Sequence, residues 1–271
     1  MKTLYSYITE DYDAPVMMNK IDGHVHFFDT DQYVFDYTTP VFEKSVGFID
    51  VEPKRIKKYA DCMGHYDTFI KNHYDKNTMI LLAASTSAEN MIAIHKKYPK
   101  IIKGFGEIKC YDEWKGKSLK LKGLMQYWDV FKYAGENNLP VYIHYSLNTD
   151  VDIQRLDKCL TKFPSTTFVL CHCGTDEFQE DKSAAIHSTI ALMSNHGNLW
   201  ADISYTAIDY FSSNPMLLGQ LPQDRIIMGS DINPALFNKN KEDGEIYLKM
   251  QNIDKYIHSD TNIKNLFHIN A

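Results

Sequence analysis

Residues 21–29 read Ile21-Asp22-Gly23-His24-Val25-His26-Phe27-Phe28-Asp29, and this stretch has the composition of a buried β-strand that ends in polar residues. Side chains alternate between the two faces of a strand, so His24 and His26 point to the same side. Two neutral imidazoles that converge on one point suit a divalent transition metal. A His-x-His pair can also be two unrelated polar residues at a strand end, so the metal interpretation depends on the rest of the chain.

The composition is that of an ordinary globular protein. The chain has 271 residues, of which 44% are hydrophobic and 24% are charged, which is enough for a single large domain over residues 1–271. The net charge of -6 disfavours a surface that binds nucleic acid. The sequence has neither a basic segment followed by an apolar run at its start nor 18 consecutive apolar residues, so we expect a cytoplasmic protein without membrane contact.

The five cysteines are too scattered in a chain of this length to form a disulfide framework, and we expect them to be reduced. The sequence Cys171-His172-Cys173 resembles a metal cluster at first sight. On a strand, however, both cysteines would face away from the histidine, so one centre could not easily take all three residues. We expect buried thiols that pack against helices.

Short apolar runs alternate with amphipathic helices along the chain. The runs lack polar alternation, which is typical of parallel strands covered on both faces. Seven strands are clear, and the best candidate for an eighth is Val46–Val51 within residues 34–51. The seven clear strands are expected over residues 21–29, 79–84, 101–109, 141–144, 167–172, 199–203 and 225–231.

This alternation predicts right-handed βαβ crossovers and a parallel sheet. No Gly-x-Gly-x-x-Gly sequence follows a strand, so the dinucleotide signature of an open, doubly wound sheet is missing. We therefore expect an α/β protein with a (β/α)8 TIM barrel that is distorted around its second strand. Residues 1–19 would form an N-terminal extension, and residues 29–52 a loop excursion over the barrel mouth.

Capping signals place several helices. Thr86 and Glu89 form a capping box for a helix that extends to Tyr98. Asp150 caps a helix that ends before Pro164. Further helices are expected over residues 53–70, 121–131, 183–194 and 242–267.

Polar residues at the carboxyl ends of the strands form one set. In a parallel barrel these ends open onto the same face, which is the face that carries catalytic residues. Residues far apart in the sequence therefore meet around one axis, and the set predicts a metal centre. Its members are His24, His26, Glu107, His144, His172 and Asp231.

Each member of this set has a simpler explanation when it is taken alone. His144 could be a hydrogen-bonded core histidine, and Asp231 could cap the following helix. Glu107 could be an ion-paired carboxylate. Lys109 shares the face of Glu107 and, as a carbamate, could bridge two metals. The sequence leaves open whether Glu107, Lys109 or neither contacts a metal.

Four segments, taken in order, carry a family resemblance: Asp22-Gly23-His24-Val25-His26, Leu139–His144, Leu170–Gly174, and Met228–Asp231 with Pro234 close behind. The chain resembles the amidohydrolase superfamily, and most of all the amidohydrolase-related branch that includes aminocarboxymuconate-semialdehyde decarboxylase. The resemblance spans roughly residues 20–235. It implies a metal-centred barrel in which His24, His26, His144 and Asp231 are ligands, and His172 is either catalytic or a ligand to a second metal.

A fifth segment, Gly104-Phe105-Gly106-Glu107-Ile108, resembles the fourth strand of TatD-type nucleases and phosphotriesterase-like hydrolases. In those proteins a glutamate can hold two metals together. This differs from the single-metal pattern of the decarboxylase branch. The number of metals, one or two per chain, therefore stays open.

The primary expectation is hydrolysis of a small ester, lactone or amide with a divalent metal, first of all Zn²⁺, with Mn²⁺ as the alternative. His24, His26 and His144 would hold this metal. Asp231 would orient water and accept its proton. His172 would polarise the scissile carbonyl or stabilise the developing oxyanion.

Three other functions are kept as alternatives. The first is a non-oxidative decarboxylase of a small carboxylic acid, although none of the three arginines, Arg55, Arg155 and Arg225, lies at a strand end where it could bind a carboxylate. The second is a TatD-like two-metal nuclease, which the acidic balance opposes. The third is a barrel that only binds a ligand. The expected partner is a small-molecule substrate, and the sequence does not decide whether the chain forms a homo-oligomer.

Overall fold

The structure is a computed structural model that describes residues 20–28, 44–50, 70, 78–82, 87–110, 113–114, 117–118, 123–176, 179, 181–231 and 242–268. In β1 the side chains are described only as far as residue 24. The predicted extension over residues 1–19 lies outside the described residues. So do residues 29–43 and 51–52 of the predicted excursion and, apart from the buried helical residue Ile70, the predicted helix over residues 53–70.

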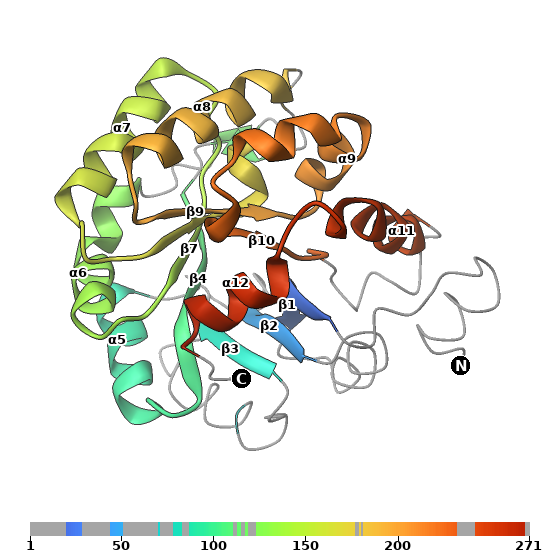
Figure 1. Ribbon diagram of the computed structural model, residues 1–271. Helices are drawn as coiled ribbons and strands as arrows, with labels where there is room; N and C mark the ends of the chain where they lie inside the picture. The colour runs from blue at the N-terminus through green and yellow to red at the C-terminus, as the bar shows by residue number, and fades with distance from the viewer. Residues whose placement is uncertain are drawn as a thin grey trace.

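Eight parallel strands form one sheet in the order β1-β2-β3-β4-β7-β8-β9-β10 (Figure 1). The eighth strand that the sequence placed within residues 34–51 is β2, which pairs with both β1 and β3. The β1–β2 ladder has a register shift between Asp22 and Val25. The strands are β1 (Ile21–Phe28), β2 (Lys44–Asp50), β3 (Thr78–Leu82), β4 (Ile102–Lys109), β7 (Val141–His144), β8 (Phe168–Leu170), β9 (Leu199–Ile203) and β10 (Ile226–Met228).

The first and last strands of this order lie next to each other. Within the described residues β1 and β10 share no ladder, but the backbone N–H of Asp231 donates to the carbonyl of His24 at 2.8 Å. Gly229 makes this approach tight, because an added Cβ would lie 2.3 Å from the backbone nitrogen of His24. The sheet therefore curves round until the segment after β10 meets β1, as predicted for an α/β barrel.

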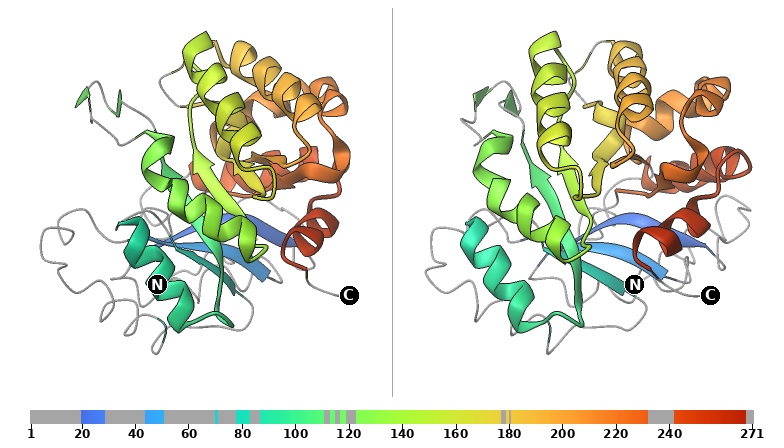
Figure 2. Two further views of the ribbon diagram at one scale, coloured as in Figure 1. Left: turned by 90° about the vertical axis from the view of Figure 1, so that its left-hand side faces the viewer. Right: turned by 60° about the vertical axis from the view of Figure 1, so that its left-hand side comes forward.

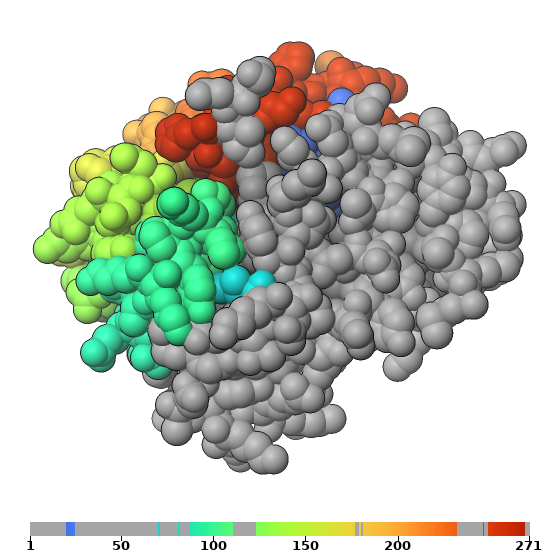
Figure 3. All heavy atoms as spheres, turned by 90° about the horizontal axis from the view of Figure 1, so that it is seen from below, coloured from blue at the N-terminus to red at the C-terminus, as the bar shows by residue number. Residues whose placement is uncertain are grey.

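Helices cover the outside of the sheet. In the turned views of Figure 2 they follow one another round the strands, and α5 lies beside α6 on the face that Figure 3 shows. The helices are α5 (Ala88–Lys97), α6 (Trp128–Glu136), α7 (Asp150–Lys162), α8 (Lys182–Asn195), α9 (Thr206–Ser213), α11 (Glu242–Asp254) and α12 (Ser259–Leu266), with the short 3-10 turns η1 (Leu124–Tyr127), η2 (Cys171–Gly174), η3 (Pro215–Gln220) and η4 (Gln223–Arg225). A small antiparallel pair, β5 (Glu113–Trp114) and β6 (Lys117–Ser118), stands apart from the main sheet. No helix in the described part of the chain has the length and apolar composition needed to cross a membrane.

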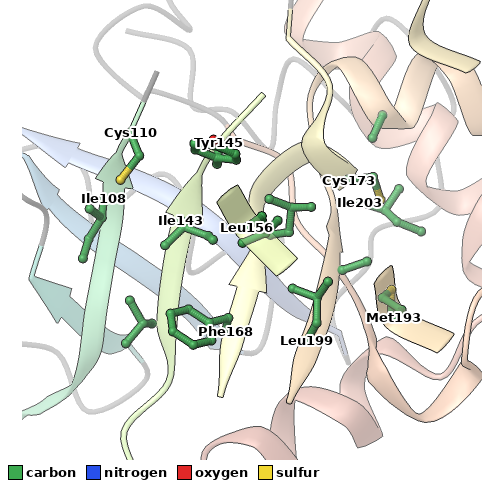
Figure 4. Close-up of a cluster of buried hydrophobic side chains, with 14 of the residues drawn as sticks. Ile108, Cys110, Ile143, Tyr145, Leu156, Phe168, Cys173, Met193, Leu199 and Ile203 are labelled. Atoms are coloured by element: carbon green, nitrogen blue, oxygen red, sulfur yellow. The ribbon is translucent and has the colours of Figure 1, made fainter. Parts of the chain in front are cut away.

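Alternating strand residues divide the core into two layers. In β8, Phe168 and Leu170 belong to the outer layer between the sheet and the helices, whereas Val169 belongs to the inner layer. Figure 4 shows part of the outer layer, in which side chains from β4, β7, β8 and β9 meet Leu156 of α7 and Met193 of α8. The inner layer consists of Ile21, Leu81, Tyr142, Val169, Cys171, Ile227, Ile263 and Leu266.

Helix α12 joins the two end strands. Its Ile263 and Leu266 pack with Ile21 of β1 in the inner layer. Asp260 Oδ1 accepts from the backbone N–H of Ile21 at 2.9 Å, and Ser259 Oγ accepts from that of Met228 at 2.8 Å. These contacts hold β1 and β10 together where ladder hydrogen bonds are not formed.

Two predicted caps are each displaced by one residue. Helix α5 is capped by Ser87, whose Oγ accepts from the backbone N–H of Asn90, so Thr86 was the wrong choice. Helix α7 is capped by Thr149, which forms a capping box with Asp152, and Asp150 is the first helical residue. In both cases adjacent polar residues compete for the same position, which composition alone does not decide.

Candidate metal centre

Five of the six predicted site residues are described with their side chains, and each lies on a different strand or in the segment that follows one. They are His24 in β1, Glu107 in β4, His144 at the end of β7, His172 in η2 directly after β8, and Asp231 after β10. The sixth, His26, lies in β1, but its side chain is outside the described part, so its role stays a prediction. The structure brings the five described side chains into one cluster.

His24 lies at the centre of the cluster and is fully buried. Its Nδ1 lies 2.6 Å from Asp202 Oδ2, and its Nε2 lies 3.2 Å from Asp231 Oδ1. A carboxylate only accepts hydrogen bonds, so the proton of this short bond is on Nδ1. Burial lowers the pKa of His24, but Asp202 and Asp231 outweigh it and hold this pKa well above its ordinary value.

Glu107 connects two other histidines of the cluster. Its Oε1 lies 2.6 Å from His144 Nδ1 and 3.4 Å from His172 Nε2, and its Oε2 lies 3.6 Å from Lys109 Nζ. Burial raises the pKa of Glu107, but His144 and Lys109 outweigh it and keep this pKa well below its ordinary value. The preceding Gly106 has a φ of 136° and abuts Tyr142, a conformation that only glycine adopts readily.

His144 donates from Nδ1 to Glu107, which leaves Nε2 as the nitrogen that can bind a cation. Its ring lies 4.7 Å from the ring of His172, measured between centroids. Burial is the main cause that lowers the pKa of His144, against the opposing effect of Glu107. The neutral imidazole is the form that binds metals.

His172 is not on a strand, contrary to the prediction of a strand over residues 167–172. Strand β8 ends at Leu170, and His172 and Cys173 have φ values of 55° and 52°. This left-handed turn places His172 Nδ1 2.8 Å from Ser204 Oγ and directs Nε2 to within 3.7 Å of Asp231 Oδ2. The hydrophobic pattern of the sequence does not indicate this turn, because the turn follows the buried residues of β8 without a break in the pattern.

The turn also changes the expected placement of the cysteines. Cys173 packs in the outer layer, as predicted, but Cys171 lies in the inner layer beside Tyr142. The Cys171 sulfur, Asp202 and His24 have ligand atoms within 4.8 Å of one another. Burial holds the pKa of the Cys171 thiol well above its ordinary value, which disfavours the thiolate form.

A second group of ligand atoms fits a cation better. Atoms of His24, Glu107 and His172 also lie within 4.8 Å of one another. Because His24 Nδ1 carries the proton, its Nε2 presents a lone pair to Asp231 Oδ1, another acceptor. Two acceptors at 3.2 Å require positive charge between them, which is either an additional proton or a metal cation. Imidazole nitrogens with carboxylate oxygens are ligands typical of Zn²⁺ and related divalent metals.

Asp22 attaches the segment after β10 to the cluster. Its Oδ1 accepts from the backbone N–H groups of His24 (3.1 Å) and Ser230 (2.9 Å), and its Oδ2 accepts from Ser230 Oγ at 2.6 Å. Burial raises the pKa of Asp22 to about 6 against these hydrogen bonds. This carboxylate positions Gly229, Ser230 and Asp231 against His24.

Sequence reasoning missed four residues that support the cluster. They do not reach its centre themselves but hold residues that do, a relation that exists only in the folded chain. Asp202 gave one signal, because an acidic residue near the carboxyl end of an otherwise apolar strand needs a partner. The four residues are Asp22, Asp202, Ser204 and Ser230.

The described residues also line a cavity of about 1370 Å³ between residues of η1, α6 and α7. None of the five cluster residues lines it, although Tyr145 and Ser146, which directly follow His144, do. Three basic residues of α7, Arg155, Lys158 and Lys162, are on its wall. The convergence of ligand atoms, and not the size of this cavity, locates the candidate centre.

Comparison with known families gives a direct result. A family model described as Amidohydrolase matches residues 102–271. The chain belongs to the amidohydrolase family. The matched segment of this amidohydrolase contains Glu107, His144, His172 and Asp231, whereas β1 with its two histidines precedes it. No curated protein matches the sequence.

Solved structures share the fold of this amidohydrolase over almost its whole length. A TatD homolog from Escherichia coli K12 has 13% identity and a TM-score of 0.62, covering 94% of this chain and 100% of that one. An amidohydrolase from Burkholderia multivorans with bound Zn has 10% identity and a TM-score of 0.58, covering 92% and 96%. A 2,6-dihydroxybenzoate decarboxylase from Rhizobium has 12% identity and a TM-score of 0.57, covering 94% and 100%. At these identities the likeness establishes the barrel fold and leaves the reaction open.

Proposed function

We propose that this amidohydrolase is a metal-dependent hydrolase that acts on a small ester, lactone or amide. The divalent cation, first of all Zn²⁺, would be held by His24, His172 and Asp231, with Glu107 and His144 beside them. The observation that carries the proposal is the meeting of the His24 and His172 Nε2 atoms with two carboxylates in a buried cluster. The bound Zn of the Burkholderia multivorans structure supports the choice of metal.

Exposure indicates the side from which substrate approaches. The side chains of His24, Glu107 and His172 are at most 2% exposed, whereas those of His144 and Asp231 are 18% and 15% exposed. Water and substrate therefore reach the centre past His144 and Asp231. When bound, Zn²⁺ acidifies water and polarises a carbonyl group.

Asp231 is the group proposed to move the proton. It is the most exposed carboxylate of the cluster, and its two oxygens face two different imidazoles. From this position it can accept the proton of the attacking water and deliver it to the leaving group. Glu107 is fully buried and already bonded to His144, so it is less suited to this exchange.

The number of metals follows from the role of Glu107. Its Oε1 faces both His144 and His172, a placement from which one carboxylate can serve two cations. In the proposed mononuclear centre, Glu107 instead orients His144 through Nδ1. Zinc analysis by inductively coupled plasma mass spectrometry separates these cases, because one equivalent per chain supports the mononuclear centre and two support a binuclear centre.

The experiment that tests the reaction compares substrate classes on one preparation. The purified chain, loaded with Zn²⁺ or Mn²⁺, is assayed with aryl esters, lactones and N-acyl amides, with hydroxybenzoates for CO₂ release, and with bis(p-nitrophenyl) phosphate. We expect ester, lactone or amide hydrolysis that dipicolinate abolishes and added metal restores. CO₂ release alone, phosphodiester cleavage alone, or metal binding without any turnover would each contradict the proposal.

A decarboxylase is the second candidate, and an arginine on the wall of the cavity favours it. The sequence showed no arginine at a strand end, but Arg155 lines this cavity together with Lys158 and Lys162. Arg225, in contrast, donates hydrogen bonds to the backbone carbonyls of Met193, His196 and Leu199. Arg155 could hold a substrate carboxylate in this cavity, although Asp152, which lies 3.8 Å from it, and two further acidic residues, Asp176 and Asp181, line the cavity as well. CO₂ release from hydroxybenzoates that Arg155→Gln reduces would support this candidate over the hydrolase.

A further inference from the structure

A chain of buried hydrogen bonds connects the two central histidines behind the proposed metal site. Asp202 Oδ2 lies 2.6 Å from His24 Nδ1 and 2.7 Å from Ser204 Oγ. Ser204 Oγ in turn lies 2.8 Å from His172 Nδ1. His24, Asp202 and Ser204 are fully buried, and His172 is 1% exposed. The chain spans β1, β9 and the turn after β8 without contact to solvent.

The donors in this chain follow from its chemistry. A carboxylate has no proton to give, so Asp202 Oδ2 accepts from both of its neighbours. Ser204 has a single hydroxyl proton, and the 2.7 Å bond to Asp202 uses it. Ser204 must therefore accept the proton of His172 Nδ1 in the 2.8 Å bond between them. Both imidazoles then carry a proton on Nδ1.

We propose that Asp202 and Ser204 are positioning residues that fix His24 and His172 in the Nδ1–H tautomer. With Nδ1 protonated, both Nε2 lone pairs are directed into the cluster, where Glu107 and Asp231 lie. This inference rests on the proposed function, which supplies the metal cation as the ligand. It also adds one detail to that function. His172 becomes a ligand to the metal through Nε2, and not a proton donor to the oxyanion.

Serine, histidine and aspartate in contact could also form a nucleophilic triad, but the geometry opposes this. In such a triad the hydroxyl donates to the imidazole, which donates to the carboxylate. Here the hydroxyl lies between the two other groups and donates to the carboxylate. Ser204 is also completely buried, so no substrate reaches its oxygen. Its contacts are those of a group that orients metal ligands.

The test uses the full chain labelled with ¹⁵N-histidine, both free of metal and loaded with Zn²⁺. Long-range ¹H–¹⁵N correlation spectra distinguish the two tautomers and the metal-bound nitrogen. In the wild type without metal, we expect the Nδ1–H tautomer for His172, and for His24 a protonated Nδ1 with the additional proton on Nε2 opposite Asp231. With Zn²⁺ we expect Nε2 coordination of both histidines. In Ser204→Ala we expect His172 to lose its preference for Nδ1–H while His24, still bonded to Asp202, keeps it.

Affinity for Zn²⁺, measured by competition with a chromophoric chelator, gives a second readout. Loss of a partner behind a metal ligand typically weakens binding about 10- to 100-fold, and we expect a loss of this size in Ser204→Ala. Ser204→Thr keeps the hydroxyl and should recover most of the affinity. Ser212→Ala is the matched control, because Ser212 Oγ donates only to the Ile208 carbonyl in α9, and it should bind like the wild type.

Two results would overturn the inference. One is a wild-type spectrum in which His172 carries its proton on Nε2. The other is a folded Ser204→Ala or Ser204→Cys variant with unchanged His172 signals and unchanged Zn²⁺ affinity. If the wild type shows a proton on Nδ1 of both histidines but binds no Zn²⁺, the positioning role is supported and the proposed metal-dependent function fails.

Discussion

The Nε2 of His24 lies 3.2 Å from Oδ1 of Asp231, although the two residues come from the first strand and from the segment after the last strand of the barrel. This pair depends directly on the fold, because the closeness of β1 and the segment after β10 also creates the proposed cation site. The backbone bond from Asp231 to the His24 carbonyl and the Asp22 contacts to Ser230 hold it in place.

Replacing Asp231 with asparagine should abolish most turnover and keep the fold. The amide cannot accept a proton as the carboxylate does, so we expect kcat to fall by about 10²- to 10⁴-fold, the usual contribution of a general base. Steady-state kinetics measure this loss, and thermal unfolding of the variant shows whether the fold persists. A folded Asp231→Asn variant with wild-type turnover would remove Asp231 from the mechanism.

Replacing His172 with alanine should lower metal affinity as well as turnover. Because His172 is proposed as a direct ligand, the loss in Zn²⁺ affinity should exceed the roughly 10- to 100-fold that an outer-shell change costs. Chelator competition measures it, and His187→Ala, an exposed histidine of α8, is the control. Full metal binding together with lost turnover would return His172 to the role of oxyanion stabiliser.

Replacing Gly229 with alanine should destabilise the protein. A Cβ at this position would lie 2.3 Å from the His24 nitrogen and its Cβ, so β1 and the segment after β10 must move apart. Overpacking of this kind costs about 1–3 kcal/mol or more in the free energy of unfolding. Urea unfolding compares this variant with Gly197→Ala, where an added Cβ meets nothing within 4 Å. Equal stability of the two variants would show that the contact is not tight.

His95 of α5 should make the stability depend on pH. Burial, with Lys103 as a second cause, lowers the pKa of His95 below its ordinary value of 6.5. Below about pH 6.5 the unfolded chain binds a proton that the folded chain does not, so the free energy of unfolding falls as the pH decreases. The slope is at most about 1.4 kcal/mol per pH unit for one group.

The measurement is urea unfolding between pH 5 and 8 for the wild type, His95→Gln and the control His187→Gln. The His95 variant should lose less stability on acidification than the other two proteins. The same slope in all three would exclude His95 as a cause of acid sensitivity.

Much of the barrel could be predicted because its parallel strands are buried on both faces. The runs at residues 141–144, 199–203 and 225–231 contain strands β7, β9 and β10, since a strand covered by helices outside and side chains inside is apolar throughout. Strand β2 was predicted too, but only as a candidate. Its sequence includes a glycine and has no long aliphatic run, so the strand signal is weak.

The site was predicted in part for the same reason. His24, Glu107, His144 and Asp231 end or interrupt apolar strands, and barrel topology brings those ends together. Asp202 and Ser204 act through other side chains, and their partners are known only once the fold brings Asp202 to His24 and Ser204 to the turn after β8. The left-handed turn at His172 also lies beyond pattern reasoning, since it depends on how the chain leaves β8.

The most direct test of the proposed centre is a crystal structure of the Zn²⁺-loaded protein with anomalous diffraction recorded on both sides of the zinc absorption edge. The account predicts one anomalous peak bonded to the Nε2 atoms of His24 and His172 and to a carboxylate oxygen of Asp231. A peak outside this cluster, or no peak from protein that contains stoichiometric zinc in solution, would contradict it.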